Sequence, residues 1–280
     1  MPTREIVLRA LSREASNERN ISSHRRMPAL FVGHGNPMNA IEPNAFHRSW
    51  QELAQRLPRP TAIVCISAHW ETRGIAVTAS SRPETIHDFL GFPKELFDVQ
   101  YPAPGAPHLA RRVTELLAGT PVRQDKERGL DHGAWSVLIA MYPQADIPVV
   151  QLSLDTREQG LFHFEAGRKL AALRDEGVLI LGSGNIVHNL RLFQFHAAAP
   201  LDWAVQFDDE IRTRLAAHEH GALTAYPLLG ENARLAIPTP EHFLPLLYVI
   251  AVQDDNEPLS FFNRVVMSSI SMTSVIVGDC

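Results

Sequence analysis

The sequence predicts an α/β fold, a single domain in which a central mixed sheet is flanked by helices on both faces. Three observations support this prediction. Short apolar runs alternate along the chain with longer segments whose apolar residues recur at helical spacing. Several runs are continuously apolar, which is typical of strands buried on both faces. The 280 residues contain no repeat and no linker, and they are enough to bury one large core.

The strands are expected where the apolar runs are short and lie between turn-forming residues. Five such runs precede a last one near the C-terminus, and the predicted strands are Ala29–Gly33, Ala62–Ser67, Ile75–Thr78, Pro148–Leu154, Val178–Gly182 and Ile270–Val277.

The helices are expected between these strands, at Phe46–Leu57, Pro107–Leu117, Trp135–Met141, Gly160–Arg174, Trp203–Ala217 and Pro240–Val252. Before the last of them, Thr239 resembles an N-cap, and Pro240 and Glu241 suit a first helical turn. Residues 80–105 form a long segment rich in proline and aromatic residues. A loop of that length in a compact domain predicts a functional loop.

The composition of the chain limits which cellular compartment and which classes of partner are expected. Residues 1–26 are polar and lack a signal-peptide core, so we expect a partly helical or disordered arm before an ordered domain of residues 27–280. A net charge of −5 without a basic stripe argues against nucleic acid, and no apolar run approaches a membrane span. Cys65 and Cys280 have no metal or redox spacing, which favours a reducing, cytoplasmic compartment. Nothing indicates the oligomeric state.

Four of the 13 histidines are placed where elements of an α/β fold end. His34 and His69 follow predicted strands, His188 follows another across a glycine-containing turn, and His242 lies in the first turn of a predicted helix. Ligands bind beyond the carboxyl ends of strands in such sheets. A helix N-terminus also keeps an imidazole neutral, the form that binds metal. The placement predicts a shared metal site, although no short ligand spacing names the metal.

Six stretches carry a resemblance to a known family: "MPALFVGHGNPMN", "ISAHW", "IHDFLGFPKELFDVQYPAPG", "DHGAWSVLIAMYP", "GSGNIVHNLR" and "TPEHFLPLLY". Together they resemble the 4,5-DOPA extradiol dioxygenase-like proteins of the class III (LigB-type) extradiol ring-cleavage dioxygenases, from Met27 to the C-terminus. The resemblance implies a LigB-type α/β fold and a non-haem Fe(II). It also implies a reaction that opens a catechol ring beside its hydroxyls and inserts both atoms of O2.

The resemblance also implies roles for single residues. His34 and His69 match metal ligands, His188 matches the active-site histidine, and His132 matches a second catalytic histidine nearby. His242 occupies a position where many LigB-type enzymes use a glutamate ligand, and the adjacent Glu241 is the alternative to it.

Ligand counting limits how these histidines can act together. Iron offers about six positions, of which a chelating catecholate needs two and dioxygen one. His34, His69, His188 and His242 therefore cannot all be ligands during turnover, and His188 is expected to leave the metal and act as acid and base. An imidazole-rich site binds Zn(II) at least as well as Fe(II), so zinc is expected to be found bound.

The loop of residues 80–105 is expected to form the substrate wall. His87, Phe92 and Tyr101 are the predicted substrate-binding residues, beside Phe89 and Phe97. The alternative is that these aromatic residues form a small core within the loop itself.

Two other functions compete with a dioxygenase. A zinc hydrolase would need a carboxylate base, for which Asp88, Asp131 and Glu241 are available. A non-enzymatic relative would use the same pocket only for binding, and it would not need an open metal site.

Overall fold

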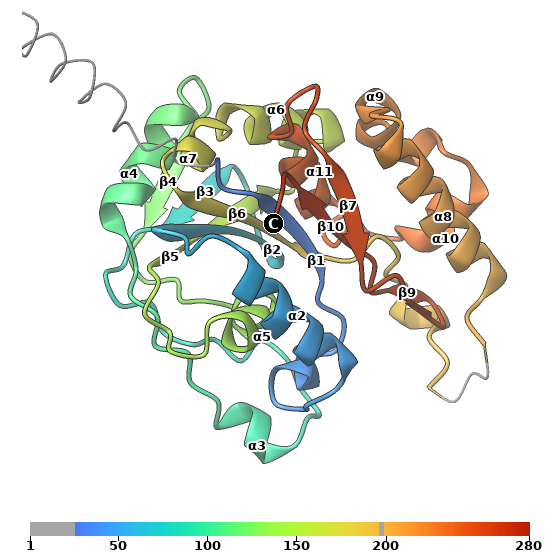
Figure 1. Cartoon of the computed structure of the whole chain (residues 1–280), viewed down its shortest axis with the longest axis horizontal. Helices are drawn as coiled ribbons and strands as arrows, with labels where there is room; N and C mark the ends of the chain where they lie inside the picture. Colours follow the sequence, from blue (N-terminus) through green and yellow to red (C-terminus); the bar gives the residue numbers. More distant parts are fainter. Residues whose placement is uncertain (1–25, 196–198) are drawn as a thin grey trace, which may run out of the picture.

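The computed structural model describes residues 26–195 and 199–280. Their main feature is an eight-stranded mixed sheet in the order β4-β3-β5-β2-β6-β1-β10-β7, with a small hairpin, β8-β9, beside it (Figure 1). The strands are β1 (Ala29–Gly33), β2 (Ala62–Thr72), β3 (Ile75–Thr78), β4 (Val122–Asp125), β5 (Val149–Asp155), β6 (Val178–Gly184), β7 (Leu259–Phe262), β8 (Val266–Met267), β9 (Ile270–Ser271) and β10 (Ser274–Val277).

The helices lie on both faces of this sheet (Figure 1). They are α2 (Ala45–Arg56), α3 (Lys94–Phe97), α4 (Pro107–Leu116), α5 (His132–Met141), α6 (Gly160–Lys169), α7 (Ala172–Asp175), α8 (Asp202–Ala216), α9 (His220–Thr224), α10 (Glu231–Ala236) and α11 (Leu244–Ala251). Short 3-10 turns occur at Pro37–Ala40, Leu190–Leu192 and Tyr226–Leu228. The predicted fold class is confirmed.

Successive residues of a strand point to opposite faces, and this divides the core in two. In β1, Leu30 and Val32 pack with α2 and α5 on one face. Ala29 and Phe31 pack with helices α4, α6, α8 and α11 on the other face. The central strands are therefore buried on both sides, which is why they appear as continuous apolar runs.

The strands that position the site are parallel. β5, β2, β6 and β1 are neighbours in parallel ladders, and their carboxyl ends lie at one edge of the sheet. The pairing of β2 with β6 ends at Ser67, and its pairing with β5 shifts between Ile66 and Glu71. His69 therefore lies inside an irregular extension of β2, and the prediction that it follows the end of a strand is wrong.

Four other predicted elements differ clearly from the structure, and the first of them, the predicted helix Gly160–Arg174, is divided between α6 and α7. α5 begins at His132, three residues earlier than predicted, because Asp131 caps it through its side chain. The last predicted strand is divided between β9 and β10. α11 begins at Leu244 with Pro245 in its first turn, so His242 lies in the turn before the helix and the first-turn prediction is wrong.

The structure covers little of the predicted N-terminal arm, and it bears on the membrane prediction only for the described residues. The expected arm of residues 1–26 lies outside the described residues except for Arg26, whose side chain pairs with Asp175 and Asp254. Among the residues that the structure describes, no helix is both long and apolar enough to cross a membrane.

Candidate active site

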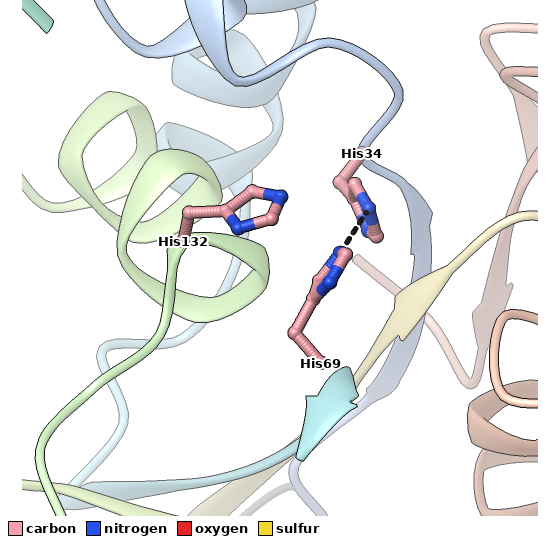
Figure 2. Close-up of side chains that lie close together, drawn as sticks. All are labelled: His34, His69 and His132. Carbon is pink, nitrogen blue, oxygen red and sulfur yellow. Dashed lines mark hydrogen bonds between the residues drawn. The ribbon is translucent and has the colours of Figure 1, made fainter. Parts of the chain in front are cut away.

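Two imidazoles meet at the edge of the sheet where β1 ends and the irregular extension of β2 begins. His34 follows β1 directly and His69 projects from the extension of β2 (Figure 2). Their ring centroids are 5.0 Å apart and their Nε2 atoms lie 3.1 Å apart. His34 is buried and His69 is half-buried.

A third imidazole faces this pair from the first turn of α5. The ring centroid of His132 lies 3.9 Å from that of His69 and 5.9 Å from that of His34 (Figure 2). Asp88 accepts hydrogen bonds from the backbone N–H of His132 and from its Nδ1, both at 2.9 Å. The Nε2 atom of His132 therefore carries a lone pair when the ring is neutral.

His242 and His188 complete the cluster from the other side. The ring centroid of His242 lies 5.4 Å from that of His34 and 5.1 Å from that of His69, so these three rings form a nearly regular triangle. His188 stacks on His242 at 3.4 Å with an interplanar angle of 10°. An imidazole lone pair lies in the plane of its ring, so an ion in the plane of His242 lies outside the plane of His188.

The predicted histidines thus come together in space, although they are separated by more than 200 residues in the chain. His34, His69 and His132 have ligand atoms within 4.8 Å of one another, and so do His188, Glu241 and His242.

The geometry of this cluster fits a metal ion. Two nitrogens bound at about 2.1 Å to one ion, at angles of about 90–110°, lie roughly 3.0–3.4 Å apart. The Nε2 atoms of His34 and His69, at 3.1 Å, fall in that range. His242 Nδ1 lies 3.0 Å from the Glu241 carboxylate, and its Nε2 is buried with no protein hydrogen-bond partner. Buried polar nitrogens without a partner are rare, and a metal ion would satisfy this one.

Burial keeps the rings of His34, His69, His188 and His242 neutral. It lowers the pKa of His34 and His242 well below the usual range, and the charges of the neighbouring histidines lower both further. Burial likewise lowers the pKa of His69 and of His188 to about 4. Neutral imidazoles are the metal-binding form, and the cause here is burial rather than the helix terminus expected for His242.

The three carboxylates considered as possible bases each have other partners. Asp131 is fully buried and accepts hydrogen bonds from Ser67 and Gln151. Burial raises the pKa of Asp88, but its bonds with His132 outweigh this and bring that pKa to about 2. Glu241 Oε1 accepts from Thr239 as well as from His242. In this arrangement Glu241 is hydrogen-bonded to His242, and its carboxylate also belongs to a group that could hold a metal ion.

The loop of residues 80–105 reaches the cluster through one aromatic residue. The ring of Phe89 contacts those of His132 and Phe92, at centroid distances of 5.4 Å and 5.2 Å. His87 Nε2 donates to the Val99 carbonyl, within the loop.

Tyr101 does not reach the cluster, because it is a core residue. Only 1 % of its surface is exposed, and its hydroxyl donates to the Tyr142 carbonyl. Its predicted contact with substrate finds no support in this position. Aromatic residues of the loop pack on one another, as in the alternative of a small core, and Phe89 also contacts the cluster.

One contact of the site had no counterpart in the sequence prediction. Ser183, near the end of β6, lies 3.0 Å from His34 Nδ1 through its Oγ. The motif "GSGN" (residues 182–185) could have indicated such a contact, because small residues at a strand end let neighbouring segments of the chain approach the strand closely. Gly184 shows this, since a Cβ there would lie 2.1 Å from the His242 carbonyl oxygen.

Comparisons with known proteins agree with this geometry. The family model described as the catalytic LigB subunit of aromatic ring-opening dioxygenase matches residues 21–278, six residues further towards the N-terminus than the recognised motifs. The chain is 53 % identical over 265 residues to "4,5-DOPA dioxygenase extradiol" of Escherichia coli (strain K12), covering 92 % of this chain and 97 % of that protein. It is 42 % identical to the protein of the same name from Beta vulgaris, covering 81 % of this chain and 87 % of the relative.

A solved structure is also similar. A crystal structure of an uncharacterized protein from Escherichia coli K12 superimposes with a TM-score of 0.80 at 50 % identity, covering 90 % of this chain and all of the other. The fold, the histidine cluster and the match over nearly the whole chain lead to one conclusion: the chain belongs to the LigB family of aromatic ring-opening dioxygenases and is an extradiol ring-cleavage dioxygenase.

Proposed function

We propose that the chain is an Fe(II)-dependent dioxygenase that opens catechols of the 4,5-DOPA type, with His34, His69 and His242 as the metal ligands. The observation that carries the ligand assignment is the nearly regular triangle of these three rings, in which the buried Nε2 of His242 has no protein partner. Curated relatives named for 4,5-DOPA support the substrate class.

His188 has a different role in this proposal. Its stacking on His242 prevents both lone pairs from meeting one ion in this arrangement. With its pKa lowered to about 4 by burial, His188 is a neutral base at neutral pH. It takes a proton from a catechol hydroxyl and returns it later.

His132 is the second catalytic residue. Its Nδ1 is held by Asp88, so the Nε2 of a neutral His132 ring is a hydrogen-bond acceptor for the cluster. Phe89 gives the substrate ring an apolar surface beside His132. Phe92 packs edge to face against Phe89, and His87 stabilises the loop through its hydrogen bond to the Val99 carbonyl.

Bound Fe(II) would supply the one function that these side chains lack, which is passing an electron between the catecholate and dioxygen. Zinc has no redox chemistry, so a zinc-loaded protein would bind catechol without opening it. The buried free thiol of Cys65 in β2 fits the reducing, cytoplasmic compartment that the sequence predicts.

Three substitutions separate ligand from base. His34→Ala and His69→Ala each remove one of about three protein ligands, so the purified proteins should retain little metal. His188→Ala should keep most of its metal and lose about 10²–10⁴-fold in turnover. His108→Ala, an exposed site on α4, is the control. Metal analysis combined with oxygen consumption measures both effects, and a metal-free His188→Ala protein would overturn the assignment.

The hydrolase alternative gains no support from the site. Asp88, Asp131 and Glu241, the carboxylates considered for this role, each have other hydrogen-bonding partners, so none of the three is placed as an unengaged base for a metal-bound water.

A further inference from the structure

A single buried serine connects the metal site to the start of α5. Ser183 is fully buried in β6, where it pairs with Val32 of β1 on one side and Ser67 of β2 on the other. Its Oγ makes two contacts, at 2.5 Å to the Gly133 carbonyl oxygen and at 3.0 Å to His34 Nδ1. Gly133 follows His132 in α5.

The directions of these two hydrogen bonds follow from counting hydrogens. A hydroxyl has one hydrogen, and a carbonyl oxygen can only accept, so the Ser183 hydrogen is donated to Gly133. Oγ then has only lone pairs to offer His34. His34 Nδ1 must carry the hydrogen in that contact. A neutral imidazole has a single N–H, which leaves His34 Nε2 with its lone pair.

We propose that Ser183 is a positioning residue that fixes His34 in the Nδ1–H tautomer and aims its Nε2 lone pair at the metal. The inference rests on the metal site of the proposed function. It assigns to Ser183 the part that a carboxylate or backbone carbonyl usually plays behind a metal-binding histidine. The hydroxyl can do so because Gly133 takes up its only hydrogen.

The neighbouring strand shows a parallel arrangement that does not touch an imidazole nitrogen. Ser67, opposite Ser183, donates to Asp131 Oδ1 and accepts from the backbone N–H of His69. Both serines thus hold the first turn of α5 against the strand ends. Only Ser183 also contacts an imidazole nitrogen, and this distinguishes tautomer control from simple attachment of the helix.

The first test measures metal affinity and needs no turnover. Ser183→Ala should bind Zn²⁺ about 10–100-fold more weakly than the unaltered protein in competition with a chromophoric chelator. Ser274→Ala is a matched control, because Ser274 is also fully buried, accepts from the Gly33 N–H and donates to the Met272 carbonyl. The control should stay within about threefold of the unaltered protein. Equal losses in both variants would overturn the proposal.

The second test reads the tautomer directly in the unaltered, metal-free protein, and a variant is needed only to assign the signals. In a ¹⁵N-histidine NMR spectrum at neutral pH, the His34 signals, identified by their absence in His34→Gln, should report Nδ1–H and bare Nε2. His69 should then carry its hydrogen on Nε2, because the 3.1 Å contact with His34 Nε2 needs one. A His34 ring protonated on Nε2 would refute the proposal.

These readouts separate this inference from the proposed function. A protein that shows the tautomer and the affinity loss, yet opens no catechol, would leave the role of Ser183 standing and reject the reaction. An active enzyme whose Ser183→Ala variant keeps full Zn²⁺ affinity would support the reaction and reject the role of Ser183.

Discussion

The substitution Gly133→Ala tests how closely the start of α5 packs against the metal site. A Cβ at Gly133 would lie 2.8 Å from His69 Cδ2 and 2.4 Å from Ser67 Oγ, where ordinary contacts begin at 3.4 Å. The ring of His69 must therefore move by about 0.6 Å, or α5 must move away from the sheet. Cδ2 is bonded to Nε2, so the displacement reaches the proposed ligand atom directly.

The expected effects on stability and on metal binding differ in size. Overpacking of this kind costs about 1–3 kcal/mol in the free energy of unfolding. Replacing glycine inside a helix by alanine returns up to about 1 kcal/mol. The net loss of stability is then about 0–3 kcal/mol, whereas Zn²⁺ affinity should fall about 10–100-fold, as for other changes that disturb the support of a ligand.

Gly167→Ala provides the matched control. Gly167 also lies inside a helix, α6, and a Cβ there would lie 2.8 Å from Ala251 Cβ and from Tyr248 Cα, outside the histidine cluster. Urea unfolding of the metal-free proteins measures stability, and competition with a chelator measures affinity. If Gly133→Ala binds Zn²⁺ as tightly as Gly167→Ala does, the start of α5 does not hold His69 in place and the reasoning fails.

Three further outcomes are expected. A chain starting at Met27 should fold and bind metal, because the described contacts of Arg26 with the carboxylates of Asp175 and Asp254 are of a kind worth only about 0–1 kcal/mol each; loss of metal on truncation would contradict this. The pKa values of His69 and His188, lowered to about 4, make the unfolded state bind more protons between about pH 4 and 6.5. The metal-free protein should therefore keep its full stability above about pH 6.5 and lose stability as the pH falls towards 4. His188→Ala should reduce the slope of the unfolding free energy against pH by up to about 1.4 kcal/mol per pH unit. Urea titrations in which this slope is unchanged would argue against a buried neutral His188. Protein purified in air should often carry zinc and be inactive towards catechols, and exchange for Fe(II) without oxygen should create activity; a zinc form as fast as the iron form would exclude redox chemistry at the metal.

The parts of the fold that the sequence predicted well are those with strong local patterns. The strand Ala29–Gly33 was predicted with its observed bounds, because a run buried on both faces has no polar interruption. The extension of β2 through His69 could not be predicted, since it depends on a register shift against β5. The start of α11 was misplaced because Pro240 and Pro245 both suit a first helical turn, and only tertiary contacts select the second.

The candidate site shows the same limit. The ends of predicted strands placed His34 and His188 in one region, because topology brings such ends together, whereas His132 was identified through the family resemblance. Tertiary contacts alone show that Tyr101 belongs to the core, since an aromatic residue in a proline-rich loop has no local pattern that separates wall from core. The role of Ser183 depends on the positions of two partners, 50 and 149 residues away in the chain.

The most direct test of the central claim is the fate of labelled oxygen. The protein is loaded with Fe(II) without oxygen and then given a catechol, DOPA first, under ¹⁸O₂, and the ring-opened product is analysed by mass spectrometry. The account predicts one O2 consumed per catechol opened and both labelled atoms in the product. The product must be analysed before its oxygen atoms exchange with water. A product that then carries no label or only one labelled oxygen atom, or a protein that consumes no oxygen with any catechol, would contradict an extradiol dioxygenase at this cluster.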